Sequence, residues 1–155
     1  MRKRCYYSAS WLIILLLAFF TASAQQPVTR EDNRSVSKTL ELAHAQHEII
    51  ILLIKDSQFN KAWEATQELL ELPFPPEQEQ ALVKSLTIIT EQFFQKGRVD
   101  LSHQILDKAT KVISNPANQG DIYLVQARLY KKQGLNYKAI EAYRKYQERV
   151  EQQPK

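Results

Sequence analysis

Two histidines, His44 and His47, are the residues whose type and spacing come closest to a chemical site. They lie three positions apart in a helix-like stretch, so both imidazoles would share one face, with Glu41 and Glu48 nearby. Imidazole nitrogens and carboxylate oxygens are ligands for zinc and similar ions. A third convincing ligand is missing, because His103 belongs to a different predicted helix. A metal- or small-ligand-binding pair therefore stays an alternative to plain polar surface, which we favour.

The other reactive side chains form no recognisable catalytic group. No serine follows a strand-to-helix elbow with a paired base, and no glycine-rich loop could hold a phosphate. The carboxylates of Glu64, Glu68 and Glu71 follow one predicted helix, where such groups are usually solvated. We therefore expect no enzymatic activity, no catalytic residue and no cofactor.

Helices must position these side chains, because the alternating pattern of strands is absent. Breaks are marked by the three glycines and by prolines at positions 73–76 and 116, since proline cannot continue a helix. Periods and breaks together predict six helices, near residues 35–55, 58–72, 77–96, 99–114, 120–133 and 136–152.

The six helices group into three pairs that carry similar residues at similar positions. Small residues recur where the helices of a pair would cross, and large apolar residues recur where neighbouring pairs would meet. The last pair shows the pattern most clearly, in Ala127, Tyr130, Gly134, Ala139 and Tyr143. The corresponding turn residues of the other pairs are Gly97 and Ser57, each followed by a small residue, Ser102 and Ala62.

This pattern resembles the tetratricopeptide repeat, whose period is about 34 residues. The resemblance implies an all-α fold, with three helix-turn-helix repeats in a right-handed superhelical array, or α-solenoid. The repeats would span residues 43–76, 83–116 and 120–153, inside a domain of residues 35–155. The first unit departs most from the family pattern, because it has bulky Ile50 in place of a small residue and Ser57 in place of glycine.

The N-terminus is typical of a signal peptide. Basic residues at positions 2–4 precede an apolar run from Trp11 to Phe20, and the small residues Ala22 and Ala24 suit a signal peptidase. We expect residues 1–24 to be removed and the protein to be periplasmic or secreted; the alternative is a membrane anchor through residues 11–24. Residues 25–34 are polar, without an apolar period, and are predicted to be a flexible tether.

Charge argues against a nucleic-acid partner. Without residues 1–24 the chain keeps 18 basic and 17 acidic residues, a net charge of +1. Electrostatic binding to phosphate backbones then loses its simplest support. The charge is unevenly spread, with +4 on residues 121–155 and −3 on residues 25–120.

In the tetratricopeptide family, ligands usually lie in a concave groove lined by the first helix of each pair. Carried over by position, the resemblance implies a groove lined by His44, His47, Ile51, Lys55, Lys84, Thr87, Glu91, Phe94, Gln95, Asp121, Leu124, Arg128, Lys131 and Lys132. This mixture of apolar and cationic groups suits an acidic peptide. We therefore expect a protein-binding module or adaptor, with membrane contact only if the N-terminal segment is retained.

Six consecutive apolar residues, Ile49 to Ile54, place hydrophobic surface all round the first predicted helix. Burial within the repeat array accounts for about four of them, because neighbours cover only one or two sides of a first helix. A partner or a second copy could cover the rest. The alternative function is therefore a self-associating structural protein that uses this face.

Overall fold

The computed structural model describes residues 30–152, and all regular structure in this part of the chain is α-helical. Its helices are α1 (Arg30–Lys55), α2 (Phe59–Glu71), α3 (Glu79–Gln95), α4 (Val99–Val112), α5 (Pro116–Lys132) and α6 (Asn136–Glu151). The prediction of an all-α fold is confirmed for this part of the chain. None of these helices has both the length and the apolar character that a membrane crossing needs. The predicted signal peptide lies outside the described residues.

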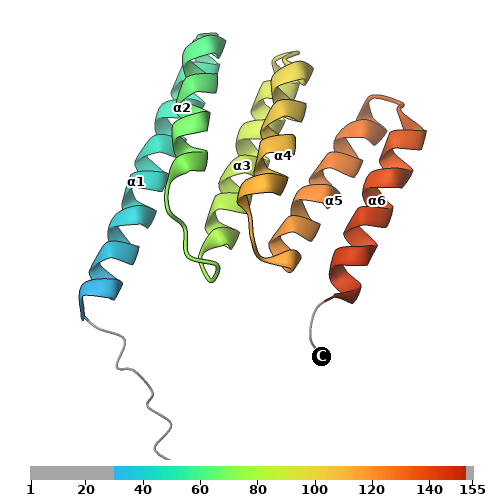
Figure 1. The fold of residues 1–155 in the computed structure, drawn as a ribbon. Helices are drawn as coiled ribbons and strands as arrows, with labels where there is room; N and C mark the ends of the chain where they lie inside the picture. The colour runs from blue at the N-terminus through green and yellow to red at the C-terminus, as the bar shows by residue number, and fades with distance from the viewer. Residues whose placement is uncertain (1–29, 153–155) are drawn as a thin grey trace, which may run out of the picture. The chain divides into compact units, whose positions relative to one another are not determined.

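Consecutive helices form antiparallel pairs, which lie side by side in chain order (Figure 1). Contacts between neighbouring pairs join α3 to α5 and α2 to α4, so first helices meet first helices and second helices meet second helices. Helix α4 also contacts α5. One side of the row is therefore built from α1, α3 and α5, and we call it the first-helix side.

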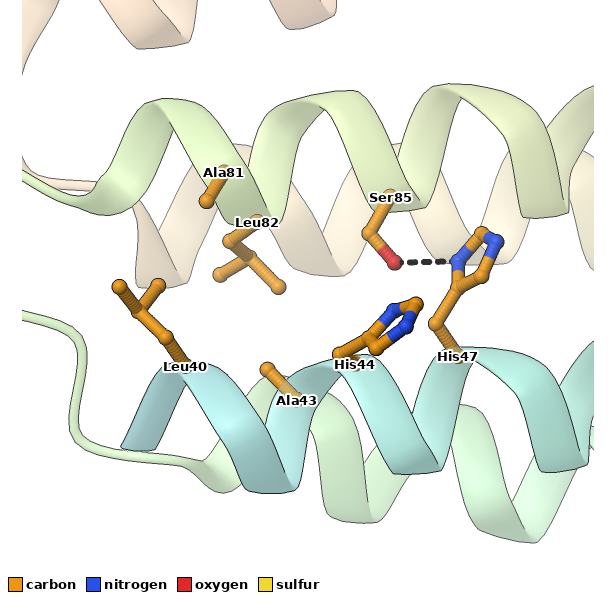
Figure 2. Close-up of a pocket in the computed structure, with 7 residues that line it drawn as sticks. All are labelled: Leu40, Ala43, His44, His47, Ala81, Leu82 and Ser85. Carbon is orange, nitrogen blue, oxygen red and sulfur yellow. Dashed lines mark hydrogen bonds between the residues drawn. The ribbon is translucent and has the colours of Figure 1, made fainter. Parts of the chain in front are cut away.

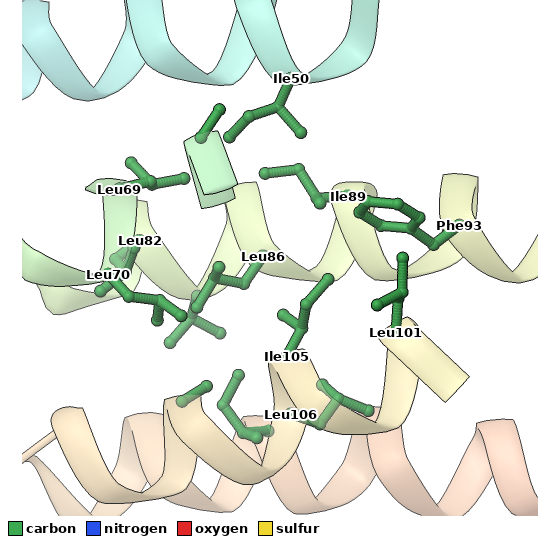
Figure 3. Packing of buried hydrophobic residues seen from close by; sticks show 14 of the residues in the cluster. Ile50, Leu69, Leu70, Leu82, Leu86, Ile89, Phe93, Leu101, Ile105 and Leu106 are labelled. Atoms are coloured by element: carbon green, nitrogen blue, oxygen red, sulfur yellow. The ribbon is translucent and has the colours of Figure 1, made fainter. Parts of the chain in front are cut away.

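The core lies at the junctions between pairs and consists of aliphatic side chains together with Phe93 (Figure 3). Ile50 of α1, Leu86 and Phe93 of α3 and Ile105 of α4 are fully buried. Burying each such side chain stabilises the fold by roughly 1.5–3 kcal/mol. Because these residues come from different pairs, their burial stacks the pairs as well as closing each one.

The apolar run from Ile49 to Ile54 is partly buried and partly exposed, as the sequence predicts. Ile50 and Ile54 are fully buried, and Ile51 and Leu53 pack partly buried against the core. Ile49 and Leu52 remain exposed. Four of the six side chains therefore belong to the core, and two do not.

The turn inside each pair has the same backbone conformation. Ser57, Gly97 and Gly134 have φ angles of 60°, 77° and 74°, in the left-handed region that favours glycine. In each turn the next residue donates its N–H to a carbonyl five positions back: Gln58 to Leu53, Arg98 to Phe93, and Leu135 to Tyr130. The predicted equivalence of the three turns therefore holds in the backbone, although serine replaces glycine in the first.

A buried small residue follows each turn at the same distance. Ala62, Ser102 and Ala139 are all buried, where a larger side chain would hold the two helices of the pair apart. The hydroxyl of Ser102 donates to a carbonyl oxygen, with Thr90 O at 3.0 Å and Arg98 O at 3.1 Å. Serine can therefore stand in this buried position because its polar atom has partners.

Two predicted boundaries are wrong. Helix α5 begins at Pro116 rather than at residue 120, because proline suits the first turn of a helix and Asn115 caps it. The Asn115 side chain accepts hydrogen bonds from the backbone N–H groups of Ala117 and Asn118. Helix α1 begins at Arg30, inside the segment predicted to be a tether, since no proline or glycine follows to break it.

A buried carboxylate joins the second pair to the third. Glu79, the first residue of α3, is only 4% exposed. It accepts hydrogen bonds from Ser114 Oγ (2.6 Å), Ser114 N (2.8 Å), Asn115 N (2.8 Å) and Asn118 Nδ2 (3.4 Å). Burial raises the pKa of this carboxyl, but the hydrogen bonds lower it by more, so the net pKa lies below its ordinary value.

Glu79→Gln should therefore destabilise the fold by about 1–3 kcal/mol near neutral pH, because the charge-assisted bonds are lost. A carboxyl whose pKa is lower in the folded state contributes stability above its unfolded pKa, and that stability disappears as pH falls through the folded pKa. The difference in the free energy of unfolding between parent and variant should thus shrink as the pH falls below 4.5, the ordinary pKa of this carboxyl. Urea unfolding at several pH values measures it.

The matched control is Glu77→Gln, because Glu77 is exposed and lies two positions earlier in the chain. Its effect on the free energy of unfolding should be close to zero at every pH. A loss of unfolding free energy in Glu79→Gln that does not change with pH would contradict the role of the ionised carboxylate.

Candidate functional site

Two hollows open between consecutive first helices. The first lies between α1 and α3 and has a volume of about 240 Å³. The second lies between α3 and α5 and has a volume of about 230 Å³. Residues of first helices alone line both hollows, so both belong to the first-helix side, and α3 contributes one edge to each.

The hollow between α1 and α3 is apolar at one end and polar at the other (Figure 2). At the polar end, His47 Nδ1 lies 2.6 Å from Ser85 Oγ, and the His44 ring lies beside them. The apolar end is lined by Leu40, Ala43, Ala81 and Leu82. Burial lowers the pKa of His47; nearby Glu48 opposes this shift and His44 adds to it, and the net pKa is below 6.5.

The structure brings the two predicted histidines together but supplies no third metal ligand. Among the described residues, no group of three His, Cys, Asp or Glu side chains is arranged to hold a metal ion. His103 lies on α4, stacked on Tyr130 at 4.6 Å between ring centroids and within hydrogen-bonding distance of Gln133. A pair of imidazoles with one ring held by Ser85 is a weaker metal site than the tetrahedral sets typical of zinc proteins.

The hollow between α3 and α5 combines apolar walls with cations. Val125 and Leu129 form part of its wall, and Arg128 and Lys132 stand at its edge together with Glu91. Lys132 Nζ pairs with Glu91 at 2.7 Å and lies 5.8 Å from the centre of the Phe94 ring. Both groups of the ion pair are about half exposed, so this bond contributes little to stability but neutralises Glu91.

Arg128 is left as an uncompensated cation. It is exposed, and it makes no hydrogen bond or ion pair within residues 30–152. Lys84 and Lys131, on the same two helices, are also exposed and without such a partner in the described part of the chain. The positive charge of this hollow is therefore available to a ligand.

The predicted groove residues thus fall into two clusters and a remainder. His44 and His47 line the first hollow, and Thr87, Glu91, Arg128 and Lys132 line the second. Phe94 is joined to the second hollow through Lys132. The residues that line neither hollow are Ile51, Lys55, Lys84, Gln95, Asp121, Leu124 and Lys131; Ile51 packs against the core instead.

Sequence reasoning missed the residues on the edges of α3. Ser85 faces α1, whereas Thr90 faces α5 and lines the second hollow. Thr90 is fully buried, and its hydroxyl has no hydrogen-bond partner among the described residues. The repeat pattern identifies the face of a first helix, but it does not reveal which edge meets the preceding pair and which meets the following one.

Comparison with protein-family models, with curated proteins and with solved structures finds no match to this chain. The properties of the site therefore rest on its own geometry.

The burial of the His47 ring predicts a pH effect on stability. Because the folded pKa of His47 is lowered, the unfolded chain binds more protons below about pH 6.5, and the free energy of unfolding should fall as pH drops through this range. His47→Gln should remove this part of the pH dependence. Thermal unfolding at several pH values compares the two, and NMR titration of the His47 ring measures its pKa directly. A pKa at or above 6.5 would contradict the burial of this ring.

Proposed function

We propose that this protein is a non-enzymatic binding module that holds an acidic, extended segment of a partner protein against its first-helix side. The observation that carries the proposal is the hollow between α3 and α5, where Arg128 stands beside apolar walls without a counter-charge in the described residues. Small apolar hollows edged by a few directed polar groups are typical of binding sites. A carboxylate of the ligand would pair with Arg128, and an apolar side chain would contact Val125 and Leu129.

The two hollows flank the same helix, which favours an extended ligand. Ser85 and Thr90 border different hollows and lie about 7–8 Å apart along α3, at 1.5 Å of rise per residue. The hollows are also separated across α3 by roughly one helix spacing of 8–10 Å. An extended chain advances about 3.3 Å per residue, so about four ligand residues would cover this step. The polar end of the first hollow, with His47 and Ser85, would then receive a neighbouring side chain.

Charge favours an acidic ligand over a basic one. Lys132 already neutralises Glu91, whereas Lys84, Arg128 and Lys131 have no anionic partner within residues 30–152. A ligand carboxylate would also keep these cations from repelling one another. Complementary charge chiefly raises the rate of association and selects among partners.

The finer architecture belongs to the same proposal. We infer a right-handed superhelical array of three tetratricopeptide-like repeats. The three equivalent turns and the buried small residues Ala62, Ser102 and Ala139 support it. A repeat array presents one continuous surface to a ligand, because each pair adds a similar helix to the same side.

The place of action is proposed from the N-terminal sequence. The basic start, the apolar run and the small residues before Gln25 support export, with the mature chain in the periplasm or outside the cell. A membrane anchor made from the same residues would place the binding module at a membrane surface.

Selection from a displayed library of random peptides tests the proposal and does not require the natural partner. Selected peptides should be enriched in Asp and Glu beside an apolar residue. Arg128→Ala should weaken their binding by about tenfold, as expected for an arginine anchor. Phe94→Ala should weaken it too, once circular dichroism shows that this variant stays folded. Fluorescence anisotropy measures each affinity.

The matched control is Arg144→Ala, because Arg144 is an exposed arginine on the second helix of the last pair. Its peptide affinity should equal that of the parent. Added salt should weaken binding to the parent, since exposed charge pairs are screened over about 8 Å at physiological ionic strength. Enrichment of basic peptides, or equal losses from both arginine variants, would contradict the proposed site.

A further inference from the structure

Helix α1 carries an uncovered apolar stripe that the groove does not use. Leu42, Ile49 and Leu52 are 49%, 47% and 57% exposed, and Ala45 between them is also exposed. Their spacing of three, four and three residues places them in one line along the helix, the pattern of a coiled-coil seam. We call these four residues the α1 seam.

The other sides of α1 are occupied. Gln46 Nε2 donates to Ala65 O (3.1 Å) and Glu68 Oε2 (2.7 Å) of α2, and His47 contacts Ser85 of α3. The α1 seam lies on the remaining side, and α1 stands at one end of the row of pairs (Figure 1). No described helix covers it.

Helix α1 is much longer than the helix that pairs with it. It has 26 residues and its partner α2 has 13, lengths of about 39 and 20 Å at 1.5 Å per residue. The N-terminal half of α1 therefore extends past the helix that packs against it. A long partner helix would bury more of the exposed side of α1 than a short one.

The charges around the α1 seam match those of a second α1 in the reverse direction. Lys38 precedes the seam in the same line and Asp56 follows it, while Glu41 and Lys55 stand along one flank. Within residues 30–152 none of the four is in an ion pair.

In an antiparallel arrangement Leu42 meets Leu52 of the other copy, and Ala45 meets Ile49. The same register brings Lys38 opposite Asp56 and Glu41 opposite Lys55, each pair occurring twice because of the twofold symmetry. A parallel arrangement would instead place Lys38 and Asp56, which lie in the line of the seam, each against its own copy, and would separate Glu41 from Lys55.

We propose that a second copy of this chain docks on the α1 seam, antiparallel to the first, and forms a twofold symmetric dimer. The seam supplies the apolar centre of the contact. Opposite charges pair at its ends, Lys38 with Asp56, and along its flank, Glu41 with Lys55. Glu48 meets its own copy near the axis, and this like-charge pair keeps the affinity moderate. The first-helix hollows stay outside the contact, so the dimer presents four of them, two from each copy.

Another apolar surface provides the competing arrangement. Tyr137 and Ile140 of α6 are 82% and 53% exposed at the opposite end of the row. Contact between the α1 seam of one copy and α6 of the next would be heterologous and would continue into a chain of subunits. The symmetric dimer instead closes on itself.

Sedimentation equilibrium on protein purified from cells that express all 155 residues tests the proposal. The parent should sediment as a dimer that dissociates on dilution. Leu52→Gln should raise the dissociation constant by about tenfold or more, as expected for a large apolar side chain that the contact would bury. The matched control Ile140→Gln, an exposed apolar residue on α6, should leave it unchanged. A monomeric parent, open-ended growth, or a loss caused by Ile140→Gln would overturn the proposal.

Charge reversal tests the direction of the contact. Glu41→Lys and Lys55→Glu should each raise the dissociation constant severalfold, by placing like charges opposite each other at two places. The double variant should recover the affinity of the parent, because reversed charges again face their opposites. If either residue had a purely structural role, the double variant would not recover the affinity. A double variant that stays weak therefore overturns the antiparallel register.

Disulfide trapping gives an independent readout. In a Cys5→Ser background the chain has no cysteine of its own, so Ala45→Cys and Ile49→Cys variants can be mixed under oxidising conditions. The antiparallel register predicts that the mixed disulfide dominates over either symmetric one. Dominance of the symmetric products would show a parallel contact and overturn the proposal.

Discussion

The buried carboxylate of Glu79 is the interaction on which the arrangement of the second and third pairs depends. It ties the start of α3 to Ser114 and Asn115, which form the connection from α4 to α5. An ionised group at this depth is tolerated because backbone and side-chain donors surround it. By fixing where α5 begins relative to α3, it also fixes the walls of the hollow between them. The proposed ligand site is thus maintained by a contact at the far end of the same helices.

The molecule presents two surfaces of different chemistry. The first-helix side is cationic and hollowed, and its apolar groups are recessed beside Arg128. The α1 seam is exposed and apolar, with charges at its ends and along one flank. A recessed site selects a ligand by shape and charge, whereas a line of exposed leucine and isoleucine side chains is stabilised chiefly by removal from water. Both surfaces include residues of α1: one side of this helix lines the first hollow, and another side carries the seam.

The repeat pattern predicts the six helices, their pairing and the equivalence of Ser57, Gly97 and Gly134. It can do so because the type of a residue determines which local backbone conformations it favours. The start of α5 did not follow from the pattern, since Pro116 both breaks a helix and begins one, and only the Asn115 cap decides between the two. Four residues of the groove that the resemblance implies, Arg128, Lys132, Thr87 and Glu91, line one hollow in the structure. The pattern could not find Ser85 and Thr90, because their places depend on the order in which pairs stack.

The sequence by itself determined the all-α class, the turn positions and the excess of apolar residues in Ile49 to Ile54, because helical periodicity and backbone preference are local properties. Only the tertiary structure decided which of these apolar side chains are buried, since that depends on the positions of α2 and α3 around α1. It also decided that Glu79 reaches residues more than thirty positions away and that His47 faces Ser85. Contacts between distant segments depend on how whole helices pack, and no short stretch of sequence contains that information.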